Sequence, residues 1–334
     1  MRKIRKTVEG LIKFVRALTL LACGAGGLLP GTGNAAYPEQ PITMIVAYAP
    51  GGGTDLVARA IAPYIEKYLG EGARIIVLNR TGAGGEIGFA ALANAPRDGY
   101  TIGFINTPPV ITIPIERKAA YAWQNLELLG NIVDDPGNFS VHAESPFKNL
   151  DDLAAYAKTN PGAVSVGTTG SGSDDHLAMV LFEKIAGVKM NDIPFKGSAD
   201  VRTALAGKQI VVGAINVGEA LQFSKGGAPM RQLGQMSQAR SVLAPDLPTF
   251  KEQGYDMEMA SLRGMAAPKG LPPAIRDRLA KAIEQAAADP GFHVQAAKFF
   301  APLRYLPPAK YEAELREGEE QFRRLWNETP WIDK

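Results

Sequence analysis

Glycine-rich loops that follow short apolar runs are the part of this sequence whose chemistry is easiest to interpret. In the first, residues 50–55, three consecutive glycines separate an apolar run, residues 42–48, from a helical pattern. Glycines let a ligand approach the backbone, and a helix start offers unpaired N–H groups and a partial positive charge. This combination favours an anion site for a carboxylate or a phosphate. A tight strand–helix turn without a ligand explains the same residues, and this loop alone does not decide.

The same arrangement of apolar run, loop and helix start occurs twice more. Residues 80–88 form a second glycine-rich loop, and residues 167–177 form a third that is also rich in hydroxyls. A polar loop at residues 106–109 follows another short apolar run. In an open α/β sheet such loops lie together at the carboxyl ends of the strands, where ligands bind. We therefore predict one binding site assembled from several loops.

Asp174 and Asp175 follow the hydroxyl-rich loop and fall in the first turn of the next predicted helix. Ser173 or Asp174 at this position is an ordinary helix cap, whether or not a ligand binds nearby. Acidic residues in a first turn favour the helix dipole but repel an anion placed there. We expect the two aspartates either to point away from the ligand or to contact a cationic part of it.

The elements that must position these loops follow from hydrophobic periodicity. Apolar residues spaced as on one helix face predict a helix over residues 56–69, and a second α/β pattern spans about 140–262. The stretch between them, residues 110–148, is predicted to be irregular because prolines interrupt it. The more helical C-terminal part, residues 273–326, is expected to pack back on the first unit. A chain that crosses twice between two units leaves a cleft where they join.

The first 36 residues differ in composition from the rest. They carry six basic residues and one acidic residue, then a mostly apolar run and small residues up to Ala36. This order is typical of a secretory signal peptide. Without it, the 36 basic and 34 acidic residues become 30 and 33, a net charge of −3, and no basic run indicates nucleic-acid binding. The mature protein is expected to be soluble and periplasmic, with cleavage near Ala35 or Ala36.

Several other kinds of site find little support. Cys23 is the only cysteine and lies in the predicted leader, where a lipoprotein cleavage box is the alternative to ordinary cleavage. The three isolated histidines form no metal-ligand cluster, so we predict no metal and no cofactor. The glycine loops also lack the spacing of a dinucleotide fingerprint. His176 beside Ser171 or Ser173 suggests a hydrolase triad, but side chains within one helical turn rarely converge as a triad requires.

Several motifs in order resemble the extracytoplasmic solute receptors of tripartite tricarboxylate transporters, the Bug receptors. The resemblance covers residues 38–305 and rests on the segments 50–55, 79–85, 98–101, 170–177, 194–198, 247–254 and 267–270. It implies a two-lobed α/β fold of the type II periplasmic binding protein kind, each lobe a mixed sheet flanked by helices, with a ligand cleft between the lobes. Residues 37–139 with 263–334 would form lobe 1, and residues 140–262 lobe 2.

The resemblance also implies a function without catalysis. Such a receptor binds a small carboxylate (a di- or tricarboxylate, an acidic amino acid or an aromatic carboxylate) and delivers it to a membrane permease. We expect a monomer; a receptor for a sensor kinase and an exported hydrolase are the alternatives. The ligand-binding residues carried over or chosen from the loops are Tyr48, Gly52, Gly53, Thr54, Asp55, Ala83, Gly84, Thr107, Thr168, Thr169, Gly170, Ser171, Ser173, His176, Lys196 and Asn216. Arg263 is ranked below Lys196 as a charge partner.

Overall fold

The computed structural model describes residues 37–70 and 72–332. Contacts divide the chain into two units, residues 1–39 and residues 40–334, and the fold belongs to the second. The predictions of a signal peptide over residues 1–36 and of a processed or lipid-bearing Cys23 lie outside the described residues. No helix among the described residues is long and apolar enough to span a membrane.

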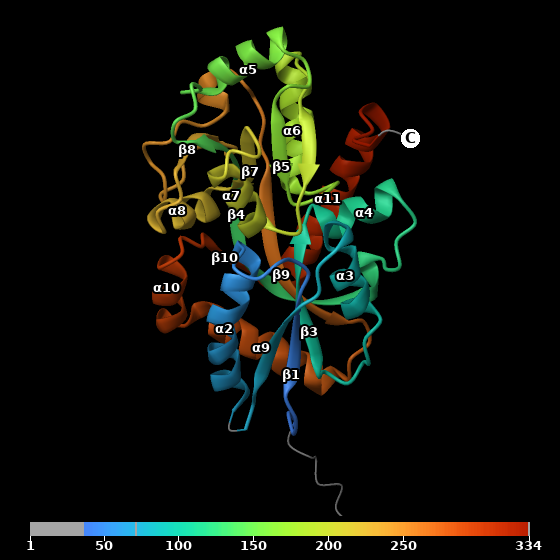
Figure 1. The fold of residues 1–334 in the computed structure, drawn as a ribbon. Helices are drawn as coiled ribbons and strands as arrows, with labels where there is room; N and C mark the ends of the chain where they lie inside the picture. Colours follow the sequence, from blue (N-terminus) through green and yellow to red (C-terminus); the bar gives the residue numbers. More distant parts are fainter. Residues whose placement is uncertain (1–36, 71, 333–334) are drawn as a thin grey trace, which may run out of the picture. The chain divides into compact units, whose positions relative to one another are not determined.

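The strands of the described residues join in the order β2-β1-β3-β9-β4-β7-β5-β6, with β8 and β10 also paired to β4 (Figure 1). Pairing is parallel within β2-β1-β3 and within β6-β5-β7, whereas β9 and β4 run antiparallel to their neighbours. The strands are β1 (Ile42–Val46), β2 (Ile75–Asn79), β3 (Thr101–Thr107), β4 (Leu126–His142), β5 (Ser165–Thr168), β6 (Asn191–Pro194), β7 (Val212–Asn216), β8 (Met230–Gln235), β9 (Ala260–Pro268) and β10 (Leu303–Leu306).

The long strand β4 belongs to both halves of this sheet. Its first part pairs with β9 and β10, and its second part pairs with β7 and β8. The partner changes at Pro136, which is opposite Ala260 of β9, and Gly137, which is opposite Asn216 of β7. We call the half with β1, β2, β3, β9 and β10 the first sheet, and the half with β5, β6, β7 and β8 the second sheet.

Helices connect the strands and cover both sheets (Figure 1). They are α2 (Gly53–Leu69), α3 (Glu86–Ala93), α4 (Pro109–Glu116), α5 (Leu150–Thr159), α6 (Asp174–Ala186), α7 (Ser198–Ala206), α8 (Val217–Lys225), α9 (Pro273–Ala288), α10 (Pro290–Ala297) and α11 (Pro308–Glu328). Short 3-10 turns occupy Ala83–Gly85, Trp123–Asn125 and Lys251–Gln253.

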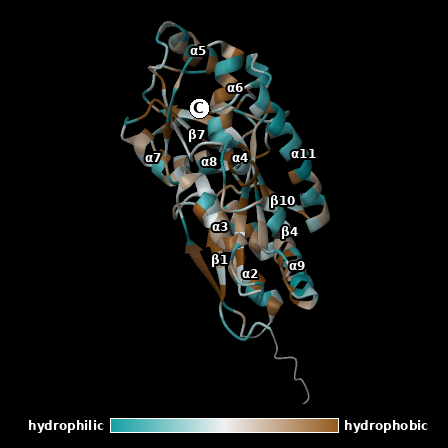
Figure 2. Cartoon of the chain, turned by 90° about the vertical axis from the view of Figure 1, so that its right-hand side faces the viewer, coloured by the Kyte–Doolittle hydropathy of each residue, from teal (hydrophilic) through white to brown (hydrophobic). Residues whose placement is uncertain are grey.

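The periodic residues of α2 form its buried face. Val57, Ile61, Ile65 and Leu69 are four residues apart, so they lie in one row that is fully removed from solvent. Both α9 and α10 pack against α2, while α11 packs against α4 and β4, so the C-terminal helices return to the N-terminal α/β pattern, as expected. Helix α11 is hydrophilic over most of its length (Figure 2). Its only fully buried residues are Tyr311 and Leu315.

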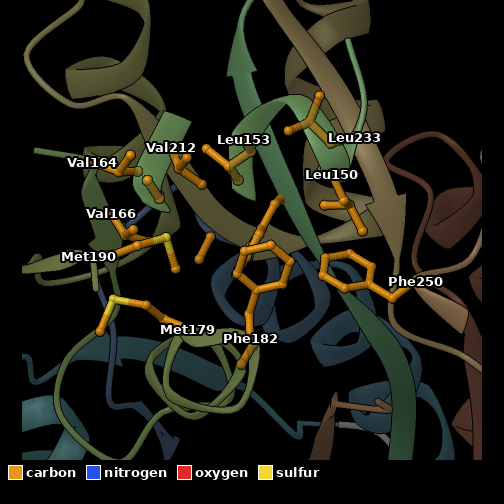
Figure 3. Close-up of a cluster of buried hydrophobic side chains, with 14 of the residues drawn as sticks. Leu150, Leu153, Val164, Val166, Met179, Phe182, Met190, Val212, Leu233 and Phe250 are labelled. Atoms are coloured by element: carbon orange, nitrogen blue, oxygen red, sulfur yellow. The ribbon is translucent and has the colours of Figure 1, made fainter. Parts of the chain in front are cut away.

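The core of the second sheet is built around aromatic rings. Phe182 of α6 lies edge-on to Phe139 of β4, with ring centroids 5.5 Å apart, and 6.1 Å from Phe250. Leucine and valine side chains from α5, β5, β7 and β8, together with Met179 of α6 and Met190 just before β6, close around these rings (Figure 3). This packing fixes α6, and therefore its N-terminal turn, against the sheet.

The prediction that residues 110–148 are irregular was wrong. This stretch contains most of α4 and the whole of β4, the longest strand of the described residues. Pro114 lies inside α4, and Pro136 stands where β4 exchanges one partner strand for the other. Of the interrupting prolines, only Pro146 lies in a loop, between β4 and α5.

Candidate functional site

A small cavity lies where loops and strand ends of the first and second sheets meet. Its volume is about 30 Å³, which is room for about two water molecules. Three carboxylates and one guanidinium are among its lining residues, which are Tyr48, Gly52, Gly53, Thr54, Asn106, Thr169, Asp174, Asp175, Ser198, Asn216, Glu219, Ser261 and Arg263.

The N-terminus of α2 already binds carboxylates of the chain itself. The Gly51 N–H donates to Asp55 Oδ2 over 2.9 Å, and the Gly53 N–H donates to Glu219 Oε1 over 2.7 Å. The Ser198 hydroxyl donates to the same Glu219 oxygen over 2.8 Å. The helix start therefore holds the side chain of Glu219, which follows β7; that the glycine loop also binds the anion of a ligand stays a prediction.

Gly53 is a glycine because nothing larger fits between these groups. A Cβ atom built on Gly53 would lie 2.3 Å from Arg263 Nη1 and 2.5 Å from Glu219 Oε1. Both neighbours are buried and paired with each other, so neither can move without breaking the ion pair. The bare backbone lets α2 of the first sheet and Glu219 of α8 meet directly.

Asp55 stabilises the glycine loop before α2 but is not among the residues that line the cavity. Its carboxylate binds the Arg59 side chain, and its Oδ1 also accepts from Asn79 Nδ2 over 2.9 Å. Burial opposes its ionised form, but the hydrogen bonds from Arg59, Gly51 and Asn79 outweigh burial and lower the pKa of Asp55. An ionised Asp55 thus holds the turn that presents the α2 N-terminus.

Arg263 is the positive centre of the cavity. This fully buried side chain on β9 lies 3.3 Å from Asp135 Oδ2 and 3.3 Å from Glu219 Oε1, and it donates to Asn216 Oδ1 over 2.8 Å. Burial disfavours its charge, yet Glu219 and Asp135 raise the pKa of Arg263. Burial also raises the pKa of Asp135 to about 7, although Arg263 opposes that shift.

Asp174 and Asp175 turn their side chains inward from the first turn of α6. Asp174 Oδ2 accepts from Asn216 Nδ2 over 2.7 Å, and Asp175 Oδ2 accepts from the Thr169 hydroxyl over 2.7 Å. Burial raises the pKa of Asp174 to about 6, despite the Asn216 hydrogen bond. Burial, and then the charge of Asp174, raise the pKa of Asp175 well above its usual range. Neither carboxylate forms an ion pair with a basic side chain among the described residues.

Asn106, at the end of β3, brings an unused acceptor to the cavity. Its Nδ2 donates to Thr54 Oγ1 over 2.9 Å and lies 3.5 Å from Ser261 Oγ. Its Oδ1 is buried without a hydrogen-bond partner among the described residues. A buried acceptor without a donor is costly, so this oxygen is suited to an N–H or O–H donor that enters the cavity.

The structure brings six of the predicted residues into the cavity lining, namely Tyr48, Gly52, Gly53, Thr54, Thr169 and Asn216. The second glycine loop instead contacts the third loop. The two backbones are so close that a Cβ atom built on Gly170 would lie 2.9 Å from the Gly84 Cα. The predicted residues outside the lining are Asp55, Ala83, Gly84, Thr107, Thr168, Gly170, Ser171, Ser173, His176 and Lys196. Their ligand contacts stay a prediction.

Of the two basic residues compared at the sequence level, Arg263 is in the cavity lining and Lys196 is not. Lys196 is exposed, and its backbone carbonyl accepts from the Ala49 N–H over 3.1 Å. Arg263 lies within a strand outside the loop motifs, so no local pattern marked it. Asn106 could have been found, because it ends a strand as Asn216 does. Glu219 carries the weaker signal of a capping box with Asn216 at the start of α8.

The serine and histidine residues of the third loop do not form a triad. The His176 Nδ1 accepts from the Gly172 N–H over 3.2 Å, and the Ser173 hydroxyl caps α6 by accepting from the His176 N–H over 3.1 Å. The Ser171 hydroxyl donates to Glu116. Burial lowers the pKa of His176, so the ring is neutral near pH 7. Residues 37–70 and 72–332 also contain no acidic, histidine and cysteine group placed to hold a metal.

Known proteins with related sequences and folds agree on one class. A family model described as the tripartite tricarboxylate transporter family receptor, TctC, matches residues 57–302. The protein BugT of Bordetella pertussis is 34% identical over 254 residues, which are 75% of this chain and 77% of that protein. The structure of periplasmic binding protein BugD, 32% identical, superposes with a TM-score of 0.82 over 87% of this chain and 98% of that one. R. palustris Rpa4515 with adipate is 25% identical, with a TM-score of 0.81 over 87% and 97%.

The fold and the cavity therefore define a two-lobed α/β periplasmic solute-binding protein, as predicted. The chain belongs to the receptor family of tripartite tricarboxylate transporters, which includes the Bug proteins. The family consists of solute-binding receptors, not of enzymes, and this removes the hydrolase alternative.

Proposed function

We propose that this protein captures a small carboxylate in the cavity between the two sheets and delivers it to the membrane subunits of a tripartite tricarboxylate-type transporter. The main support is that the Gly53 N–H and the Ser198 hydroxyl converge on one carboxylate oxygen, Glu219 Oε1. Donors from two separate elements are therefore already arranged around a carboxylate. A 25% identical relative, Rpa4515, holds adipate, which is a dicarboxylate.

The contacts we assign to the solute are those of the predicted residues that line the cavity. Its carboxylate lies beside the α2 N-terminus at Gly52 and Thr54, with Arg263 as the nearest positive charge. Thr169 and Asn216 close from the second sheet. The carboxylate competes with Glu219 for these donors, so removing the Glu219 charge should strengthen the binding of a plain dicarboxylate.

Entry of the solute requires the two lobes to separate. A volume of about 30 Å³ is far below the 300 Å³ or more of typical ligand pockets. We place the lobes at residues 37–139 with 263–334 and at 140–262, which are joined through β4 and β9. A solute that binds both lobes stabilises the closed form because its affinity for that form is higher.

The proposal includes export. A signal peptide over residues 1–36 would deliver the mature protein to the periplasm, where the receptor family works. Intact mass spectrometry of the secreted protein tests this, because cleavage near Ala35 or Ala36 leaves an unmodified N-terminus. A lipid-modified N-terminal Cys23 would contradict the position of cleavage and indicate membrane attachment.

A thermal-shift screen of residues 37–334 tests the solute class. The panel contains di- and tricarboxylates, acidic amino acids and aromatic carboxylates. A specific solute at 100 times its dissociation constant adds about 2.7 kcal/mol of stability. Because a solute can copurify, the protein is unfolded, dialysed and refolded before the screen. If no carboxylate shifts the melting temperature of this refolded protein, the proposal fails.

A further inference from the structure

The charges inside the cavity do not balance. Arg263 faces three carboxylates of the lining and is already paired with Glu219 and with Asp135, each at 3.3 Å. Across the described ranges, no basic nitrogen lies within 4.0 Å of the carboxylates of Asp174 or Asp175. The cavity therefore carries two buried carboxylates that form no ion pair among the described residues, and Arg263 acts on Asp174 only over a longer distance.

A second observation on the other side of the cavity points to the same missing partner. Asn106 is 5% exposed, lines the cavity, and has no donor for its Oδ1. This oxygen belongs to β3 of the first sheet, whereas Asp174 and Asp175 belong to α6 beside the second sheet. Both sides therefore present acceptors to the same small space. A group with several N–H donors and a positive charge would satisfy them together.

A plain dicarboxylate does not meet this requirement. It would add negative charge beside two carboxylates in a buried space, where like charges repel strongly. A bound metal ion is also a poor match, because the described residues hold no cluster of three or more acidic, histidine or cysteine side chains suited to one. An alkylammonium group supplies one positive charge and three donors in a small volume.

We propose that the solute is an amino carboxylate whose ammonium group is held by Asp174, Asp175 and the Asn106 Oδ1, while its carboxylate lies toward Arg263 and the α2 N-terminus. This inference rests on the proposed function and narrows it to carboxylates that carry a protonated amine. The raised pKa of Asp174, about 6, fits a cavity that lacks positive charge until the solute enters.

Matched pairs of solutes test the inference by titration calorimetry on refolded residues 37–334. Each pair differs only in the amine: L-aspartate and succinate, L-glutamate and glutarate, 4-aminobutyrate and butyrate, L-phenylalanine and 3-phenylpropionate. We expect at least one amino carboxylate to bind, and to bind at least tenfold more tightly than its partner. 1,5-Diaminopentane, which has amines and no carboxylate, tests the ammonium site separately from the carboxylate site.

Two isosteric variants connect this preference to the aspartates. Asp175→Asn and Asp174→Asn should each weaken binding of the amino carboxylate at least tenfold, while binding of its amine-free partner stays the same or improves. The matched control is Asp200→Asn, since Asp200 also lies in the first turn of a helix, α7, but is exposed and outside the cavity. Its affinities should equal those of the wild type. Circular dichroism confirms that each variant is folded.

The possible results are distinguishable. If amine-free carboxylates bind as tightly as their amino partners, the inference is overturned and the proposed function stands. If only diaminopentane binds, the acidic side of the cavity is supported and the carboxylate function fails. If neither an amino carboxylate nor diaminopentane binds, or if both aspartate variants keep the wild-type preference, the ammonium site is overturned.

Discussion

At the scale of single residues, Gly53 and Arg263 determine how the cavity closes. Gly53 leaves the space in which the Glu219 carboxylate reaches the start of α2. Arg263 joins that carboxylate to Asp135 and Asn216, which come from β4 and β7. Gly53 acts because it has no side chain. Arg263 acts through its charge, which interacts with groups on β4, β7 and α8.

Gly53→Ala should weaken solute binding at least tenfold and leave the protein folded. The added methyl group would lie 2.3 Å from Arg263 Nη1, so it pushes the cavity apart, whereas alanine favours the helix itself. Calorimetry with the tightest solute and thermal melting measure the two effects. Gly318→Ala in α11 is the control, because its Cβ would meet only ordinary contacts at 3.5 Å or more. Unchanged affinity in Gly53→Ala would contradict this account.

Arg263→Met should lower the free energy of unfolding by about 3–5 kcal/mol at pH 8, because it leaves buried carboxylates unpaired. The loss should be smaller at pH 5. The pKa of Asp135 is about 7 even beside Arg263, so without Arg263 this carboxyl takes up a proton as the pH falls and the unpaired charge disappears. Urea denaturation at both pH values measures the difference.

The control for this experiment is Arg323→Met. Arg323 is 58% exposed and pairs with Glu319 along α11, so it should change stability little at either pH. An equal loss at pH 5 and pH 8 in Arg263→Met would show that the arginine acts through packing and not through charge.

At the scale of elements, α6 connects the core of the second sheet to the cavity. Its first turn carries Asp174 and Asp175, and one residue of its buried face, Phe182, lies among Phe139 and Phe250. Ser173 caps the helix by accepting from the His176 N–H. The position of the two carboxylates therefore depends on how firmly this helix is packed.

Phe182→Ala should cost about 3–5 kcal/mol in the free energy of unfolding, since it leaves a void among aromatic rings. Urea denaturation measures it. Ile185→Ala, on the same helix but 43% exposed, should cost much less. A loss near that of Ile185→Ala would mean that this core closes over the void and that the rings do not fix α6.

At the scale of the whole molecule, β4 keeps the two halves in one sheet, and our proposal places the solute between them. The cavity collects acidic groups from α6 and α8, and its one guanidinium, which also pairs with Asp135 of β4, comes from β9. Closing the two halves around a solute therefore brings these charges together, and the charge of the solute decides whether closure is favourable.

The affinity for an amino carboxylate should rise between pH 5 and pH 8. Asp174, with a pKa of about 6, loses its proton in this range, while Arg263 stays charged. Burial and the charge of Asp174 also raise the pKa of Asp175, and Glu219 lines the same cavity. An alkylammonium keeps its proton, as lysine does with a pKa of about 10.4. Binding must therefore release protons. Calorimetry in buffers of different ionisation enthalpy detects that release, and an affinity that falls with pH would contradict the proposal.

Local patterns in the sequence determined a large part of this protein. The period of the apolar residues predicted α2, α6 and the C-terminal helices close to their observed bounds. The glycine loops favoured an anion site at the start of α2 without deciding it, and the ordered motifs identified the receptor family. These features depend on neighbours within a few turns of the chain, so a single sequence expresses them.

Only the tertiary structure decided which groups meet. Gly53 and Glu219 are 166 residues apart, and the hydrogen bond between them depends on β4, which runs from the first sheet into the second. Residue spacing could not show that Arg263 would be buried and Lys196 exposed, because burial is set by which strands become neighbours. Nor could it show that Asp174 and Asp175 point inward. Their direction follows from the packing of α6 on a core assembled from distant segments, and that packing produced the acidic side of the cavity.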